Sequence, residues 1–270
     1  VNVEADSVNS AVLGPDVTAG DDVFDMLVRD AVREVIQKTG QKCTATRRIF
    51  VPVEVADDFT DALASDLSRI SIGDPFTDGV RMGPVVNARQ RDDIMGGIDR
   101  FSSVASRVRG TGRPEQLAGV SGETGFFVDT HVLRTADPEA SLAADLVHNE
   151  EVFGPVTTIL PYDGSVAQAG ELVARGRGSL VASVYSDDRA FARDLVLELA
   201  PWSGRVTLGS AKVAESAPSP GAVLPQLVHG GPGRAGGGEE LGGERGMDFY
   251  LQRTAVQGYR PLVERLFDGT

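Results

Sequence analysis

The sequence predicts an α/β fold in which a largely parallel sheet is flanked by helices. Between residues 126 and 208, short apolar segments rich in β-branched residues alternate with segments whose apolar residues recur every three or four positions, the pattern of strands connected by helices. Hydrophobic residues make up 41% and charged residues 24% of the 270 residues, as in ordinary globular proteins. The chain is therefore able to bury one large core or two modest ones.

The first part of the chain predicts two strands and three helices. Residues 1–13 mix β-branched and small residues and stop at Gly14-Pro15, as a strand does. A helix from Asp21 to Gly40 follows from the 3.6-residue spacing of its apolar positions, and a strand, RIFVPVEV, comes soon after it. The other elements expected here are a helix marked by Phe59, Leu63, Leu67 and Ile70, a turn at 73–75, and a helix over 88–105 weakened by Gly96-Gly97.

The second part predicts the alternation that gives the sheet its parallel strands. Strands are expected at 126–134, 156–161, 180–185 and 205–208, with helices over residues 165–175 and 188–200. Beyond Ser210 the composition changes to Pro, Gly and Ala, and HGGPGRAGGGEELGGERG at 229–246 predicts a long loop. We therefore divide the chain into a terminal strand (1–13), an α/β domain (14–215) and a glycine-rich C-terminal segment (216–270).

Composition argues against several classes of partner. The formal charge of −13 opposes binding to nucleic acid, whose phosphates are held by Lys and Arg. No apolar run approaches the roughly 20 residues that span a bilayer, and the first residues lack the basic and apolar regions of a signal peptide. The single Cys43 cannot form an internal disulfide. We expect a soluble, cytoplasmic protein that binds neither nucleic acid nor a membrane.

Cys43 is the first candidate for chemistry, because it lies between a predicted helix and a predicted strand. A thiolate is a strong nucleophile, and the neighbouring Lys42, Arg47 and Arg48 favour a negative charge. A lone cysteine is, however, more often a small buried hydrophobic residue. A partner imidazole for a hydrolase would have to be His131, His148 or His229, and none has a local signature. The spacing of these histidines predicts no metal site.

The glycine-rich stretch at 230–243 invites comparison with a phosphate-binding loop. No G-K-[ST] follows it, and Glu239, Glu240 and Glu244 would repel phosphate. No G-x-G-x-x-G run follows a strand and opens a helix, as it does in dinucleotide-binding folds. We therefore interpret this stretch as a loop that packs against the rest of the protein or gates access to a site, and not as a nucleotide-binding loop.

Four segments, in this order, resemble the signature regions of the aldehyde dehydrogenase family. They are GQKCTATRRIFVP at 40–52, GDPF with MGPVVN within 73–87, GFFVDTHVLR at 125–134 and EEVFGPV at 150–156. The resemblance extends from about Val1 to Gly258. Within the family, VNVEADSVN at the start and the stretch at 227–258 are most similar to the CoA-linked semialdehyde dehydrogenases of phenylacetate and benzoate degradation.

The resemblance implies a role for each of four residues. It makes Cys43 the nucleophile and Glu4 the general base for the deacylating water. Glu151 would contact the nicotinamide ribose of NADP or NAD, and Phe153 would line one side of the nicotinamide pocket. The backbone N–H of Cys43 would donate one hydrogen bond to the oxyanion, and the second donor, an Asn, lies upstream of Val1 in the family. Glu4 is otherwise a surface charge on a frayed strand, and Glu151 a solvated carboxylate beside Glu150.

Three functions follow from these observations. The first is the catalytic portion of an NAD(P)-dependent aldehyde dehydrogenase that oxidises a small-molecule aldehyde, with CoA-linked semialdehydes as the expected class, within a homo-oligomer. The resemblance places the Rossmann-like cofactor domain upstream of this chain, so we expect the chain alone to be incompetent for hydride transfer. The second is a non-catalytic assembly module. The third is a cysteine esterase or acyltransferase that needs no cofactor.

Overall fold

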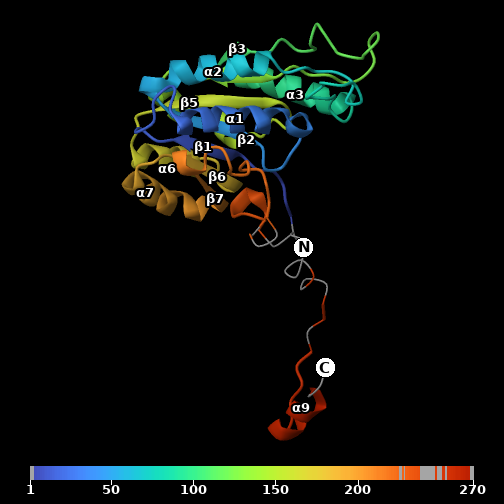
Figure 1. Cartoon of the computed structure of the whole chain (residues 1–270), viewed down its shortest axis with the longest axis vertical. Helices are drawn as coiled ribbons and strands as arrows, with labels where there is room; N and C mark the ends of the chain where they lie inside the picture. Colours follow the sequence, from blue (N-terminus) through green and yellow to red (C-terminus); the bar gives the residue numbers. More distant parts are fainter. Residues whose placement is uncertain are drawn as a thin grey trace.

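A seven-stranded sheet forms the centre of the molecule, in the order β3-β4-β5-β2-β1-β6-β7 (Figure 1). The computed structural model describes residues 3–224, 227, 229–237, 247, 251–252 and 254–267. All neighbouring strands are parallel except β3 and β4, which run antiparallel. The α/β class with a largely parallel sheet is therefore confirmed. The strands are β1 (Asn9–Leu13), β2 (Thr46–Pro52), β3 (Ser106–Arg109), β4 (His131–Arg134), β5 (Val156–Tyr162), β6 (Ser179–Tyr185) and β7 (Ser203–Gly209).

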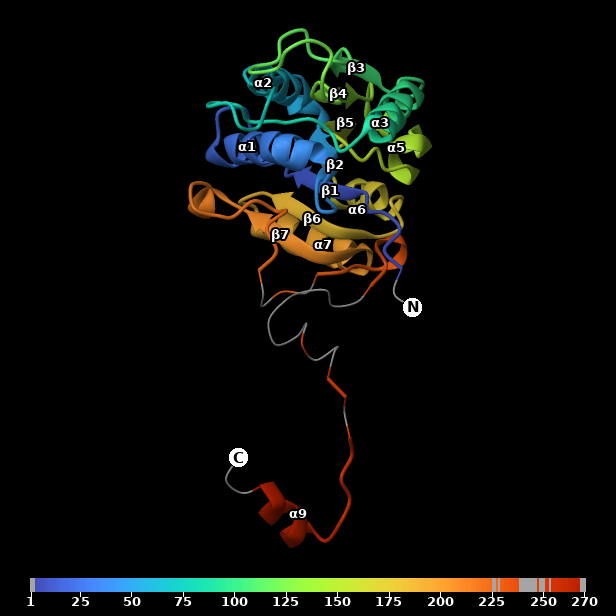
Figure 2. The ribbon, with the colours of Figure 1, turned by 90° about the vertical axis from the view of Figure 1, so that its right-hand side faces the viewer.

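Helices cover both faces of this sheet (Figure 2). On one face lie α1 (Asp22–Ile36) and α2 (Ala56–Ser68), and on the other lie α3 (Ala88–Phe101), α6 (Val166–Ala174) and α7 (Arg189–Leu199). Alternate residues of a strand point to opposite faces. Ile49 and Val51 of β2 accordingly pack with α1 and α2, whereas Phe50 packs with the helices of the other face. Each face thus encloses its own apolar core.

The elements predicted by hydrophobic spacing are mostly confirmed. The predicted helices at 21–40, 165–175 and 188–200 correspond to α1, α6 and α7. The helix predicted over 88–105 ends earlier, at Phe101, and the first strand is confined to β1. Two short helices, α4 (Pro138–Ala143) and α5 (Asp145–Asn149), were not predicted.

The strand predicted at 126–134 was largely wrong. Only β4 is a strand, because its partner β5 begins with Val156 opposite His131, so residues 126–130 lie beyond the start of the ladder. The antiparallel edge strand β3 was not foreseen, since its sequence SRVR carries little apolar signal. The RIFVPVEV strand likewise ends at Pro52, where the turn η2 (Val53–Val55) leads into α2.

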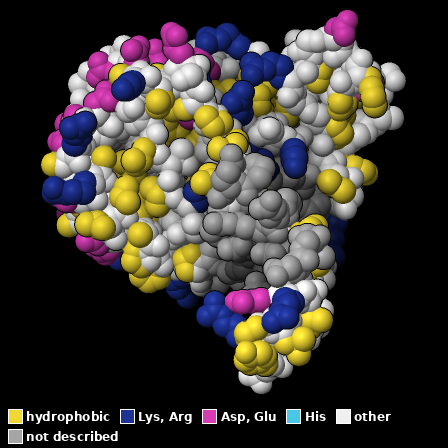
Figure 3. Space-filling model, turned by 60° about the horizontal axis from the view of Figure 1, so that its bottom comes forward, with side chains coloured by type: hydrophobic (Ala, Val, Ile, Leu, Met, Phe, Trp, Pro, Cys, Tyr) yellow, Lys and Arg dark blue, Asp and Glu magenta, His cyan; other side chains and the backbone are white. Residues whose placement is uncertain are grey.

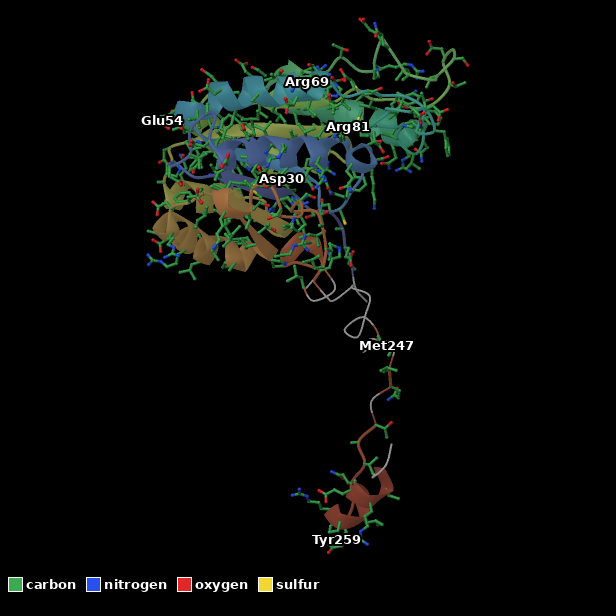
Figure 4. The ribbon with its side chains drawn as sticks, in the orientation of Figure 1. Asp30, Glu54, Arg69, Arg81, Met247 and Tyr259 are labelled. Atoms are coloured by element: carbon green, nitrogen blue, oxygen red, sulfur yellow. The ribbon has the colours of Figure 1, made fainter. Side chains whose placement is uncertain are left out.

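The described residues after position 246 lie away from the sheet. Met247 and Tyr259 mark its course, and α9 (Arg260–Phe267) lies well separated from the sheet and its helices (Figures 1 and 4). In Figure 3 the bottom of the molecule as drawn in Figure 1 comes forward, and hydrophobic and charged side chains are interspersed over the described part of this face. Among the described residues, no helix has the length and apolarity needed to cross a membrane.

A buried arginine and a buried histidine connect β2 to the helices of the second face. Arg48 is 1% exposed and donates to the carbonyl oxygens of Val8 and Leu172 at 3.0 and 2.9 Å. Its Nη1 lies 2.9 Å from Nδ1 of His148, and Nε2 of His148 lies 2.8 Å from the carbonyl oxygen of Ser141. His148 therefore accepts at Nδ1 and donates at Nε2, which is the pattern of a neutral imidazole.

We expect this neutral imidazole to make stability depend on pH. Burial, followed by the charge of Arg48, lowers the pKa of His148 to about 4, whereas an unfolded histidine has a pKa of about 6.5. Between these values only the unfolded state takes up the proton. The contribution of His148 to the free energy of unfolding is therefore fully present above about pH 6.5 and falls by about 1.4 kcal/mol per pH unit down to about pH 4. Urea unfolding at several pH values measures this slope.

The matched variant is His148→Gln, which keeps one acceptor and one donor but does not titrate. Carboxylates that titrate in the same range are common to both proteins, so the difference between the two slopes isolates His148. Equal slopes in the wild type and His148→Gln would contradict the assignment.

Candidate active site

The segments that lead into four neighbouring parallel strands meet at one edge of the sheet. Parallel strands that lie side by side begin at the same edge, so residues distant in sequence become neighbours there. All the site residues predicted from the sequence lie in these segments. The segments are residues 4–8 before β1, 40–45 before β2, 150–155 before β5 and 177–178 before β6.

Cys43 follows a turn that only glycine can complete. In the turn η1 (Gln37–Gly40), Lys38 and Thr39 are left-handed, and Gly40 has φ +68°. A Cβ on Gly40 would lie 2.0 Å from the carbonyl oxygen of Gly154. The turn thus presses the cysteine segment (residues 40–45) against the E-V-F-G-P segment (residues 151–155), and it leaves Cys43 exposed.

Asn9 fixes the backbone at Cys43 and directly after it. Its Nδ2 donates to the carbonyl oxygens of Cys43 and Ala45 at 2.8 and 2.9 Å. Its Oδ1 accepts from the Val181 N–H at 3.1 Å, and Asn9 is 0% exposed. One buried amide therefore holds β1, β6 and the cysteine segment in a single arrangement.

Arg47 joins the cysteine segment to the E-V-F-G-P segment. Its guanidinium donates to the carbonyl oxygens of Gly40 and Gly154 at 2.8 and 2.9 Å, and its Nε pairs with Glu151 at 3.2 Å. The guanidinium carbon also lies 5.3 Å from the ring centroid of Phe153. Arg47 thereby positions both residues that the resemblance assigns to the cofactor.

Glu151 is a buried carboxylate held on both oxygens. Its side chain is 8% exposed, and Oε2 accepts a hydrogen bond from the Ser7 N–H at 3.0 Å. Burial raises the pKa of Glu151, although the charge of Arg47 and the bond from Ser7 act in the opposite direction. The geometry differs from that of a solvated surface carboxylate, the alternative considered from the sequence.

A cavity of about 440 Å³ brings the four predicted residues together. Cys43, Glu4, Glu151 and Phe153 all line it. Glu4 is exposed, whereas Phe153 is 36% exposed. Within the described residues, no group of His, Cys, Asp or Glu side chains is arranged to hold a metal ion.

His229 is the one of the three histidines considered as partners of Cys43 that lies beside the thiol, although no local signature marked it. Its Nε2 lies 4.0 Å from the Sγ of Cys43, although 186 positions separate them. Arg205 of β7 also interacts electrostatically with Cys43 and His229. No local pattern marks either residue, because Arg205 lies in β7 and His229 lies in a segment packed on β7, both distant from Cys43 in sequence.

The described part of the glycine-rich segment, residues 229–237, packs backbone against backbone. A Cβ on Gly236 (φ +96°) would lie 2.1 Å from the carbonyl oxygen of Val3, next to Glu4. Residues 231–236 match G-x-G-x-x-G, but residues 233–235 form the short turn η5 (Gly233–Ala235). This packing agrees with the predicted packing loop. Residues 238–246, with Glu239, Glu240 and Glu244, lie outside the described residues.

The sequence is similar to those of known proteins. The chain is 41% identical over 232 residues to the 3,4-dehydroadipyl-CoA semialdehyde dehydrogenase of Aromatoleum evansii, covering 86% of this chain and 44% of that protein. It is 42% identical over 178 residues to Protein MaoC of Klebsiella aerogenes, covering 66% of this chain and 50% of that protein. The chain thus spans about half the length of the curated relatives it matches.

Solved structures share the fold. Betaine aldehyde dehydrogenase from Staphylococcus aureus, in a complex with NAD+, superimposes with a TM-score of 0.76 and 26% identity over 93% of this chain and 46% of that one. The sequence model of the aldehyde dehydrogenase family matches residues 4–256. Nearly the whole chain is therefore covered, and it belongs to the aldehyde dehydrogenase family.

Proposed function

We propose that this chain forms the catalytic part of an NAD- or NADP-dependent aldehyde dehydrogenase, which oxidises an aldehyde to an acid through a thioester on Cys43. The observation that supports this proposal is the single cavity lined by Cys43, Glu4, Glu151 and Phe153. A nucleophile, a carboxylate able to act as a base, and a carboxylate beside an aromatic ring are the groups that this reaction needs.

In the first step, Sγ of Cys43 attacks the carbonyl carbon of the aldehyde to give a thiohemiacetal. The positive charge of Arg47 lies near the sulfur, and such a charge favours the thiolate. The developing oxyanion needs donors that are already in position. We assign one of them to the backbone N–H of Cys43, in the turn ahead of β2.

The residues beside Cys43 fit a nicotinamide nucleotide. Glu151 offers carboxylate oxygens that can accept from ribose hydroxyls, and Phe153 offers a ring face at the wall of the same cavity. Arg47 holds both side chains in place. A bound nicotinamide would supply the acceptor for the hydride of the thiohemiacetal carbon.

Glu4 is the proposed base for the second half of the reaction. It lines the cavity with Cys43, so a water between the two can lose a proton to the carboxylate as it attacks the thioester. General-base help of this kind contributes on the order of 10² to 10⁴ in rate. The acid is then released and the thiol restored.

The relatives narrow the proposed substrate. The Aromatoleum evansii relative is named for a CoA-linked semialdehyde, and this supports a CoA-linked semialdehyde as the substrate here. We assign catalysis to the domain at 14–215 together with Glu4 of the segment before β1, and assembly of a homo-oligomer to residues 216–270. A cytoplasmic location, with phenylacetate or benzoate degradation as the setting, belongs to the same proposal.

Glu4→Gln should slow deacylation without slowing hydride transfer, because Glu4 acts only on the attacking water. In the protein that carries this chain, stopped-flow absorbance should show a burst of reduced cofactor followed by a steady state slower by about 10² to 10⁴. Cys43→Ala should abolish the burst, since it removes the nucleophile. A Glu4→Gln protein with an unchanged steady state would require the withdrawal of Glu4 as the base.

This chain on its own should bind NAD or NADP weakly. Glu151 and Phe153 serve only the nicotinamide end, and the glycine run at 231–236 packs on other backbone segments, not at the start of a helix that could receive a pyrophosphate. Titration calorimetry of the isolated chain is the measurement. A low-micromolar dissociation constant, about −8 kcal/mol, is the result that would count against this expectation.

A second candidate function, cysteine-dependent ester hydrolysis without a cofactor, is favoured by the contact between Cys43 and His229. A thiol beside an imidazole is the pair that such hydrolases use. If this function is present, the chain should hydrolyse p-nitrophenyl acetate with turnover, and Cys43→Ser should lose that activity. A single stoichiometric release of nitrophenol, with no turnover, would leave the dehydrogenase as the remaining candidate.

A further inference from the structure

The contact between His229 and Cys43 is made by two segments that the fold holds firmly. Asn9 and Arg47 fix the cysteine segment. His229 begins a stretch whose backbone is pressed onto β7, because a Cβ on Gly204 would lie 1.6 Å from the carbonyl oxygen of Gly230. The imidazole is half-buried. Its distance of 4.0 Å from Sγ is therefore set by packing on both sides.

Among the described residues, Arg205 and Glu4 act electrostatically on this imidazole. Arg205 reaches it from β7, and Glu4 reaches it from the segment before β1. Burial and the charge of Arg205 lower the pKa of His229, whereas Glu4 acts in the opposite direction. Since an ordinary histidine has a pKa of about 6.5, His229 is neutral at pH 7 and its ring can accept a proton.

We propose that Nε2 of His229 accepts the thiol proton of Cys43 as the sulfur attacks its electrophile. The S–H bond breaks and an N–H bond forms at Nε2. The electron pair of the S–H bond becomes the new S–C bond, and the π electrons of the carbonyl move to its oxygen. The imidazolium then releases the proton to solvent.

This assignment rests on the proposed role of Cys43 as the nucleophile and adds a residue to that mechanism. It divides the two proton transfers between two groups. His229 serves the thiol, to which it lies close, and Glu4 serves the later water. A distance of 4.0 Å is long for proton transfer, and catalytic contacts of this kind commonly shorten when substrate binds.

Alkylation of the thiol provides a test that needs neither aldehyde nor cofactor. Cys43 is the only cysteine, so the rate of carbamidomethylation by iodoacetamide, followed by intact mass, reports on this residue alone. We compare the wild type with His229→Gln and His229→Phe, of which the first keeps polarity and the second keeps ring volume. Leu227→Ala, in the same segment and 39% exposed in the wild type, is the control for disturbance of the loop.

The shape of the pH profile is the decisive readout. A thiol with a pKa of about 8.5 is about 3% ionised at pH 7, so both His229 variants should react up to about 30-fold more slowly than the wild type at that pH. Above about pH 9.5, where the thiol ionises unaided, their rates should equal that of the wild type. Leu227→Ala should follow the wild-type profile throughout.

Three results would overturn the proposal. They are a wild-type rate at pH 7 no higher than that of the urea-unfolded chain, His229 variants that match the wild type, and variants that are slower by the same factor at every pH, which indicates a purely structural role. The burst experiment with Cys43→Ala judges the nucleophile independently. A lost burst together with unchanged alkylation in the His229 variants would remove His229 and leave Cys43 in place.

Discussion

Two consecutive arginines at the start of β2 hold together the segments that meet at the edge of the sheet where the parallel strands begin. Arg47 and Arg48 are 6% and 1% exposed, and they point to opposite faces because adjacent residues of a strand do so. Arg47 joins the cysteine segment to Glu151, and Arg48 donates to carbonyl oxygens of the segment before β1 and of α6. A buried charge is costly unless its donors are satisfied, so each guanidinium requires a defined arrangement of the segments around it.

The site lies where the parallel strands begin, and this location shapes its chemistry. Backbone N–H groups at this edge need acceptors, because the neighbouring strand does not supply all of them. Side chains of the site provide them: Glu151 accepts from Ser7, the hydroxyl of Ser7 accepts from Leu180, and Asn9 accepts from Val181. Two of these residues, Ser7 and Glu151, therefore satisfy the sheet edge and also line the cavity.

The sequence predicted elements with a clear period and missed those that depend on their neighbours. The spacing of apolar residues gave α1, α6 and α7, whereas β3 and the true extent of β4 depend on where β5 begins. Cys43, Glu4, Glu151 and Phe153 were identified by their motifs, and their roles stay a prediction. His229 could not be chosen among the three histidines and Asn9 was not identified, because their contacts span 186 and 34 positions and no local pattern encodes them.

The contact between Gly40 and the carbonyl oxygen of Gly154 also limits how this chain can change over evolutionary time. The two glycines belong to segments more than a hundred positions apart, yet neither backbone can shift without the other. One residue inserted in the turn before Cys43 adds up to about 3.8 Å of chain. This length is nearly equal to the 4.0 Å between Sγ of Cys43 and Nε2 of His229, so such an insertion is large enough to separate the two groups. Variation in length should therefore be tolerated at the exposed residues 121–124 and selected against in these two turns.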